Sequence, residues 1–476
     1  MITKIKAAYV VGFDGVGHEI ITNGEVVYEN DTILYVGKHY EEAVDRTEDM
    51  GNAVVMPGFI DLNALGDIDH DIIHLEVYPD VRKSLSPSEE YFDKGPHEWM
   101  TPEEEAFKSL FAYTQLIMNG VTTAMPITST YYKRWADTYE EEEAGIHHAG
   151  KLGLRLYTSP SYQCGFNVVQ PDGTMTVRFL EGEGEEGLER AVRFIRKYDG
   201  AYGGLIRGAL IEVQTEENLI RTKQYADDLE CPIKLHAAQG LFEYRYIKEK
   251  TGLSPIEYLD GIHFLDDKVG IPHCYIVKGT RWVSDDGDDL GILARTKATA
   301  IYCPVIIGRS GGYLDSFPEY RNSSVNVAIG TDTFPPDFFQ NIRVASMYAK
   351  MVSGTAEGAS YADIYNAVTL GGAQYLGRLC KGAKADLIAV DLDSFHMGAV
   401  DDPIRTIFLC GSGADVKLSV INGRTVMKDQ QIEGVDLEEI KAKGQIYYNK
   451  MKLGYMERDY QHLPAEKLFR PSFPMR

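Results

Sequence analysis

The feature that most constrains the fold is an alternation of short apolar segments with helical segments over residues 57–377. About eight apolar segments of strand length occur there, and most end in a polar residue and follow a helical segment. The helical segment 101–120 has clear limits, because Thr101, Pro102 and Glu104 form a start signal and Gly120 a stop. The alternation predicts an α/β fold, a (β/α)8 TIM-type barrel, with its active site at the C-terminal strand ends. A doubly wound sheet shares the alternation, but no Gly-rich phosphate loop follows the first strand.

The two ends of the chain have a different pattern, of short strands separated by turn residues. It occurs in residues 1–56, with an Asn-Gly turn, and returns in residues 378–430 as ADLIAVDLDS and VKLSVINGRTVMKD. We predict that these two segments form one small β-sandwich domain and that residues 57–377 form the barrel. Residues 431–476 are predicted to form a C-terminal helical tail.

Charge and composition narrow the classes of partner. The net charge of −23 argues against nucleic acid or an anionic membrane surface. The sequence has no apolar run of about 18 residues and no signal-peptide pattern, so we expect a cytoplasmic protein with no membrane partner and a small-molecule substrate. The six cysteines include no CxxC pair, which argues against a disulfide framework or a zinc knuckle.

Three predicted strand ends carry residues that could take part in catalysis or metal binding. His236 ends the strand in PIKLHAAQG, His273 lies in GIPHCYIV, and Asp332 follows the strand in VNVAIGTDTFP. A single such residue is more often structural, as a satisfied histidine or a turn aspartate. Three of them at C-terminal ends of successive barrel strands predict a functional site.

Several segments together resemble one known family. They are AVVMPGFID, GVTTAMP, LHAAQ, PHCYI, AIGTD and the pair KGAKADLIAVD and VINGRTV. In this order they resemble the amidohydrolase superfamily, in the branch of triazine chlorohydrolases and guanine and cytosine deaminases. The resemblance implies a hydrolase that activates water on one divalent metal (zinc, iron or manganese). That water would attack an amidine, cyclic amide or similar carbon and break a C–N or C–Cl bond.

The chain departs from this family at the first barrel strand. Family members end that strand with His-x-His, and both imidazoles bind the metal. Asn63 and Leu65 occupy these positions here. Leu65 cannot bind a metal, and Asn63 offers only a neutral amide oxygen, which zinc disfavours.

The remaining family positions are partly retained. The resemblance assigns His236 and Asp332 as metal ligands and His273 as the group that polarises the substrate carbonyl. Gln239 occupies the position at which deaminases keep a proton-transferring glutamate, and glutamine cannot transfer a proton at neutral pH. The predicted catalytic residues are therefore Asp332, His273, His236 and Gln239.

Two alternatives remain open for the metal. In the first, Asp67, Asp69 or His70, from the acidic segment after the first strand, joins His236 and Asp332 to rebuild a metal site. In the second, the chain is a metal-independent hydrolase or lyase on the same barrel. A non-catalytic binding protein is the third hypothesis, against which the three retained strand-end residues argue.

Further residues are predicted to bind substrate. Their places at strand ends make them candidates for lining the pocket: Asn63, Tyr162, Gln163 and Arg309. We also expect a homo-oligomer, most simply a twofold dimer.

Overall fold

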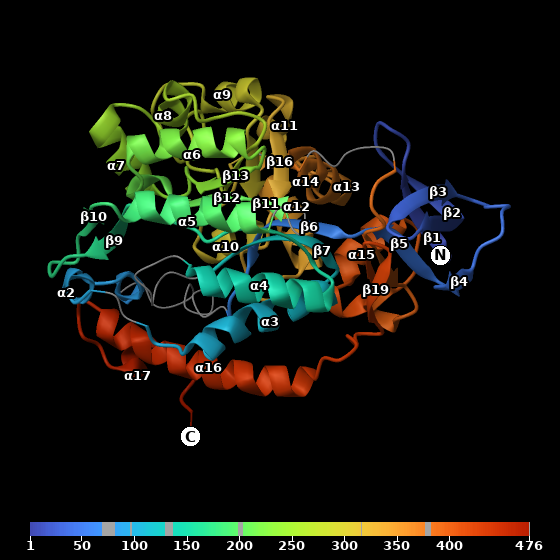
Figure 1. The fold of residues 1–476 in the computed structure, drawn as a ribbon. Coiled ribbons are helices and arrows are strands. Elements are labelled where there is room, and N and C mark those ends of the chain that lie inside the picture. Colours follow the sequence, from blue (N-terminus) through green and yellow to red (C-terminus); the bar gives the residue numbers. More distant parts are fainter. Residues whose placement is uncertain are drawn as a thin grey trace.

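The parallel strands of the chain form two adjoining sheets (Figure 1). The computed structural model describes residues 1–68, 81–95, 98–128, 137–198, 203–315, 317–376 and 382–475. One sheet has the order β11-β8-β7-β6, from β6 (Phe59–Leu65), β7 (Val121–Ile127), β8 (Arg155–Thr158) and β11 (Gly203–Gly204). The other has the order β12-β13-β14-β15-β16, from β12 (Ile206–Leu210), β13 (Ile233–His236), β14 (Val269–Pro272), β15 (Thr299–Tyr302) and β16 (Asn326–Ile329). Only Leu205 separates β11 from β12, so the two sheets are continuous through one short segment.

The first and last parallel strands are also joined to each other. The Asp332 backbone N–H, just after β16, donates to the Asn63 carbonyl of β6 over 2.8 Å. The Thr331 N–H donates to the buried Asp61 carboxylate over 3.0 Å. Burial raises the pKa of Asp61 to about 6. These contacts bring the C-terminal ends of the parallel strands to one rim.

Helices pack around these strands. The predicted helix at 101–120 is confirmed as α3 (Pro102–Met118), with Thr101 and Glu104 forming a capping box. Gly120 follows in a left-handed conformation (φ +84°), which glycine adopts without steric cost. The other long helices are α4 (Tyr139–Leu152), α5 (Glu183–Lys197), α6 (Glu216–Asp228), α7 (Leu241–Thr251), α9 (Asp289–Thr296) and α12 (Phe338–Ser353). Shorter helices are α8 (Pro255–Gly261), α10 (Pro304–Arg309), α11 (Phe317–Asn322), α13 (Tyr361–Asn366), α14 (Gly372–Tyr375) and α15 (Pro403–Cys410).

Strands from both chain ends lie in one eight-stranded sheet. Its early strands are β1 (Ile2–Phe13), β2 (His18–Glu29), β3 (Thr32–Gly37), β4 (Arg46–Asp49) and β5 (Ala53–Pro57). Its late strands are β17 (Leu387–Asp391), β18 (Val416–Ile421) and β19 (Arg424–Lys428), and β17 pairs with β5. These described strands belong to one sheet. A sandwich needs a second sheet facing the first, so the sandwich arrangement remains a prediction.

Several smaller elements complete the surroundings of the site. The hairpin of β9 (Gly165–Val169) and β10 (Met175–Phe179) packs against the 3-10 turn η2 (Ile211–Val213), which contacts β12. The short helix α2 (Glu89–Asp93) contacts β9. The C-terminal helix α16 (Leu437–Arg458) runs along the side of the molecule next to α3, and α17 (Ala465–Leu468) contacts α16 (Figure 1). Among the described residues, every helix is too short or too polar to span a bilayer.

Candidate active site

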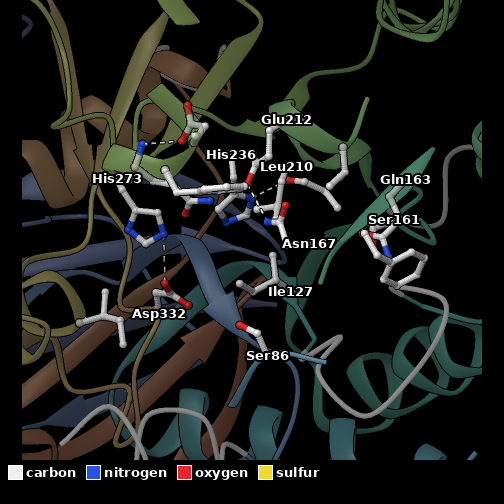
Figure 2. Close-up of a pocket in the computed structure, with 18 of the residues that line it drawn as sticks. Ser86, Ile127, Ser161, Gln163, Asn167, Leu210, Glu212, His236, His273 and Asp332 are labelled. Carbon is white, nitrogen blue, oxygen red and sulfur yellow. Dashed lines mark hydrogen bonds and ion pairs between the residues drawn. The ribbon is translucent and has the colours of Figure 1, made fainter. Parts of the chain in front are cut away.

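A cavity of about 560 Å³ lies where the parallel strands end (Figure 2). His236, His273 and Asp332 line it from the ends of β13, β14 and β16. Gln163 and Gln239, also predicted for the site, line it as well. Four of the predicted catalytic residues and one predicted substrate-binding residue therefore share one cavity.

His273 and Asp332 face each other across the cavity wall (Figure 2). The His273 Nε2 lies 3.3 Å from Asp332 Oδ2. Burial lowers the pKa of His273 to about 4, so its imidazole is neutral near pH 7. A neutral ring that holds its proton on Nε2 donates it to the carboxylate and orients it. Both residues have positive φ, 65° and 42°, a strained backbone that is common where chains turn at functional sites.

His236 has a fixed ring orientation. Its Nδ1 lies 3.0 Å from the Ala209 carbonyl, which can only accept, so Nδ1 carries the proton. The Nε2 of a neutral ring then keeps its lone pair. Burial, reinforced by the neighbouring His273 ring and Lys234 ammonium, lowers the pKa of His236 well below its usual value. His236 is thus a neutral acceptor at the cavity wall.

A buried lysine lies among the same strand ends. Lys234 Nζ donates to the Met125 carbonyl over 2.7 Å and to the Leu62 carbonyl over 3.3 Å. Burial lowers the pKa of Lys234 to about 7. Through these bonds Lys234 connects β13 to β6 and β7 below the cavity.

Asn63 lies outside the set of residues that line the cavity. Its side chain is fully buried, and its Nδ2 lies 3.7 Å from the Cys303 sulfur. A Cβ on Gly330 would meet Asn63 at 2.6 Å, so the backbone of β16 packs directly against it. The prediction that Asn63 contacts substrate therefore lacks support from its position, since close packing against β16 keeps it away from the cavity.

A metal fits a set of residues that differs from the predicted one. Ligand atoms of His273, Cys303 and Asp332 lie within 4.8 Å of one another in the described part of the chain. Imidazole, thiolate and carboxylate are all zinc ligands. In this part of the chain, two buried polar atoms beside the set, Asn63 Oδ1 and His273 Nδ1, have no hydrogen-bond partner. The donor set and these two atoms fit a divalent metal.

Cys303 was not singled out from the sequence. It is the first residue after β15, in the same relation to its strand as the other site residues have to theirs. Its place directly after an apolar strand is the one sequence signal for this role, because the absence of a CxxC pair says nothing about a single cysteine. Burial raises the pKa of the Cys303 thiol well above its usual value, so a cation is needed for the thiolate to form.

The acidic segment after β6 is described only as far as residue 68. Asp67 lines the cavity, and its carboxylate lies 3.3 Å from the buried Lys108 ammonium. Lys108 also pairs with Glu105 and Glu141. The predicted ligands Asp69 and His70 lie outside the described residues.

Two predicted substrate-binding residues point elsewhere. The Tyr162 ring is buried in the core, and its hydroxyl bonds the Thr222 hydroxyl. The Arg309 guanidinium donates to Thr333 Oγ1 over 3.1 Å and to the Phe334 carbonyl over 3.4 Å. Neither residue lines the described cavity, because Tyr162 faces the helix layer and α10 directs Arg309 over the loop after β16.

One wall of the cavity carries carboxyl groups that the sequence did not reveal. Glu212, in η2, accepts a hydrogen bond from Asn167 Nδ2 over 2.8 Å. Glu243 accepts the backbone N–H groups of Ala238 (2.6 Å) and Gln239 (2.9 Å), which fixes the turn after β13. Burial and the neighbouring Glu212 raise the pKa of Glu243 to about 8. In the sequence IEVQTEEN, Glu212 has no pattern that separates it from the acidic start of a helix.

Sequence comparison identifies relatives over most of the chain. Residues 54–426 match the sequence model described as the Amidohydrolase family. A 5-methylthioadenosine/S-adenosylhomocysteine deaminase of Pyrococcus abyssi is 24% identical, and the match covers 88% of this chain and 93% of that protein. A 5'-deoxyadenosine deaminase of Methanosarcina acetivorans is 25% identical, with 92% and 95% covered.

Solved structures share the fold. An adenosine deaminase from Xanthomonas campestris with bound zinc superposes with a TM-score of 0.76 at 19% identity, covering 95% of this chain and 98% of that chain. Atrazine chlorohydrolase from Arthrobacter aurescens TC1, complexed with zinc, gives a TM-score of 0.75 at 18% identity, with 94% and 100% covered. The α/β architecture of these enzymes is therefore the architecture of this chain.

Proposed function

The chain belongs to the amidohydrolase family and is a hydrolase acting on C–N bonds, and from this premise we propose that it deaminates an amino-substituted nitrogen heterocycle of about nucleoside size. The deaminases of nucleosides among its relatives support this substrate class. The cavity of about 560 Å³ lies within the usual range for small-molecule sites. The observation that carries the proposal is the hydrogen bond from the neutral His273 ring to the Asp332 carboxylate, in a cavity that His236 also lines.

Asp332 is the proton acceptor in this proposal. Its carboxylate removes a proton from a water as the water oxygen bonds to the ring carbon. The protonated Asp332 then donates that proton to the leaving nitrogen as the C–N bond breaks, and ammonia departs. One group serves both steps because Gln239 cannot transfer a proton.

The two histidines position the reactants. His273, neutral through burial, holds and orients the Asp332 carboxylate by its Nε2–H. His236 presents the lone pair of its Nε2 to the cavity and accepts a hydrogen bond from substrate or water. Both rings are neutral at pH 7, so the two histidines do not repel each other electrostatically.

The metal is part of the proposal because the donor set fits one. His273, Cys303 and Asp332 would hold it, and the zinc named for two of the solved relatives supports a divalent ion. When bound, such an ion supplies Lewis-acid activation of a water. The identity of the ion, zinc, iron or manganese, is left to metal analysis.

A second candidate is metal-independent hydrolysis on the same site. Asn63 and Leu65, which cannot replace two imidazoles, support it. Metal content of protein purified without chelator, with turnover before and after chelation, separates the two. Full activity in metal-free protein would favour the second candidate.

The experiment that tests the function measures the released product. Purified protein is incubated with 5'-deoxyadenosine, 5'-methylthioadenosine and adenosine, and with a chlorinated triazine for the C–Cl alternative. Release of ammonia from an amino heterocycle, abolished in Asp332→Asn, is the expected result. Release of chloride alone would favour the chlorohydrolase alternative, and absence of turnover on a broad panel would favour a non-catalytic binding protein.

The finer architecture also belongs to the proposal. The continuity of β11 with β12 and the bonds from β16 to β6 support a closed (β/α)8 barrel over residues 57–377. The eight-stranded sheet supports a small domain from residues 1–56 and 378–430. Ile446 and Leu453, both exposed on α16, support self-association, which light scattering tests.

A further inference from the structure

One wall of the cavity holds two acceptor atoms without partners. They are Glu212 Oε2 and Asn167 Oδ1, both buried and both without a hydrogen bond among the described residues. Glu212 is only 3% exposed, and both residues line the cavity. Figure 2 shows the two side chains together beside His236. A buried polar atom without a partner destabilises the folded chain, so such atoms are rare unless a ligand meets them.

Among the described residues, the wall has acceptors but no cation paired with Glu212. Both carboxyl oxygens of Glu243 accept backbone N–H groups, and Glu212 Oε2 makes no hydrogen bond to Glu243 or to another described residue. Arg207 is a cation that also lines the cavity, but it forms ion pairs with Asp137 and Glu142. Within the described part of the chain, no ion pair to Glu212 is present. A buried carboxylate that lacks a cation is stabilised by a cationic ligand.

The geometry of the two acceptors indicates the kind of donor. Asn167 Nδ2 is already used in donating to Glu212 Oε1, so its Oδ1 can only accept. A ligand group that satisfies both free oxygens must therefore present N–H or O–H donors in two directions. A planar amidinium or guanidinium does this and also carries the positive charge.

The neighbouring surface fits an apolar body attached to such a group. Phe166, Met175, Leu210 and Phe242 line the same cavity. Phe166 and Met175 come from the hairpin that carries Asn167, and Leu210 precedes Glu212 by two residues. An aromatic or heterocyclic ring can pack on them while its cationic group reaches the acceptors.

We propose that Glu212 and Asn167 form a subsite that binds a cationic, N–H-donating group of the substrate, an amidinium, guanidinium or protonated amine. This rests on the proposed function only in placing the group on a substrate of the same cavity. The subsite determines specificity and takes no part in proton transfer at the reacting carbon.

Benzamidine and benzamide are the probes that test this subsite. They have the same shape, and only benzamidine is cationic at pH 7.5. Binding to the full-length protein is measured by calorimetry or ligand-observed NMR, without turnover, so failure of the deaminase proposal does not affect the result. We expect benzamidine to bind at least about 10-fold more tightly than benzamide, the factor that about 1.4 kcal/mol represents.

Two variants locate the binding. Glu212→Gln keeps the size and the acceptor for Asn167 but removes the charge, and we expect about 10-fold weaker benzamidine binding with benzamide unchanged. Glu217→Gln, an exposed glutamate on α6, is the matched control and should bind like the wild type. Asn167→Ala should weaken benzamidine binding by a smaller factor, because it removes a neutral acceptor.

Two results would overturn the proposal. The first is equal binding of benzamidine and benzamide by the wild type, a comparison that does not depend on any variant folding. The second is equal benzamidine binding by Glu212→Gln and wild type. A further outcome is that ribose binds in a manner that depends on Glu212 while benzamidine does not bind. This would assign the two acceptors to a neutral diol and would also refute a cationic subsite.

Discussion

The two sides of the strand-end rim differ in the chemistry they carry. On one side, β13 to β16 are followed or ended by His236, His273, Cys303 and Asp332. On the other side, β6 ends at Leu65 and places no ligand of zinc or iron in the described cavity.

The comparison indicates that a candidate ligand set can be completed from strands other than the one that carries Asn63 and Leu65. The segment after β6 is acidic and adjacent in sequence, and for that reason the sequence predicts replacement ligands there. Asp67, its described member at the cavity, already pairs with Lys108. Cys303 lies across the rim and within 4.8 Å of the other two donors. Proximity in the fold, rather than in the sequence, supplies the third candidate ligand.

The largest expected effect is at the reactive side of the rim. Asp332→Asn should reduce kcat/KM by about 10²–10⁴-fold, the range for a general acid–base group, while the fold is retained. Asp401→Asn, at an exposed position, is the control with the same change of charge. Steady-state kinetics with circular dichroism checks both. Unaltered turnover in Asp332→Asn would remove this residue from the chemistry.

The second prediction concerns metal retention on the same side. Cys303→Ser replaces a soft thiolate by a poorer ligand, so zinc affinity should fall by about 10–100-fold. Cys231→Ser is the matched control, since Cys231 is also buried but precedes β13 at the other end of the strand. Metal per chain is measured after dialysis against a weak chelator. Equal retention by both variants would show that Cys303 is not a ligand.

The difference between the two sides also shows what a sequence can and cannot predict. The capping box of α3 and the strand-end places of His236, His273 and Asp332 were predictable because local patterns determine them. The orientation of a residue just past a strand was not, because successive side chains point to opposite sides. Gln163 lines the cavity while its neighbour Tyr162 is in the core.

Contacts between residues that are far apart in the sequence could not be predicted either. Asn167 and Glu212 are 45 positions apart and meet only because the β9–β10 hairpin folds against η2. Cys303 becomes a candidate metal ligand only because His273 and Asp332 lie close to it at the ends of neighbouring strands. No periodicity in a single sequence encodes such pairs.

The third prediction tests the β6 side of the rim directly. Asp67→Asn removes one of the three carboxylates that surround Lys108, so we expect a loss of about 1–3 kcal/mol in the free energy of unfolding. Zinc content should stay unchanged, because this carboxylate is engaged by Lys108. Urea denaturation and metal analysis are made on the same preparations. Loss of zinc with unchanged stability would instead make Asp67 a ligand and restore the rebuilt site.

The smallest expected effect lies at the acceptor wall and depends on pH. The pKa of Glu243 is raised to about 8, by burial and then by Glu212, so the folded chain binds more protons than the unfolded chain between about pH 4.5 and 8. This contribution to stability is complete below the lower value and is lost as the pH rises through the upper one. Glu212→Gln removes the neighbouring charge and a second buried carboxyl, so its stability should fall less steeply over this range. Relative to the wild type, the variant should gain about 1–2 kcal/mol between pH 5 and pH 8. An equal change in the free energy of unfolding between pH 5 and pH 8 for the variant and the wild type, measured by urea denaturation, would contradict a buried carboxyl pair. The difference between the two sides of the rim would then rest on the strand-end residues alone.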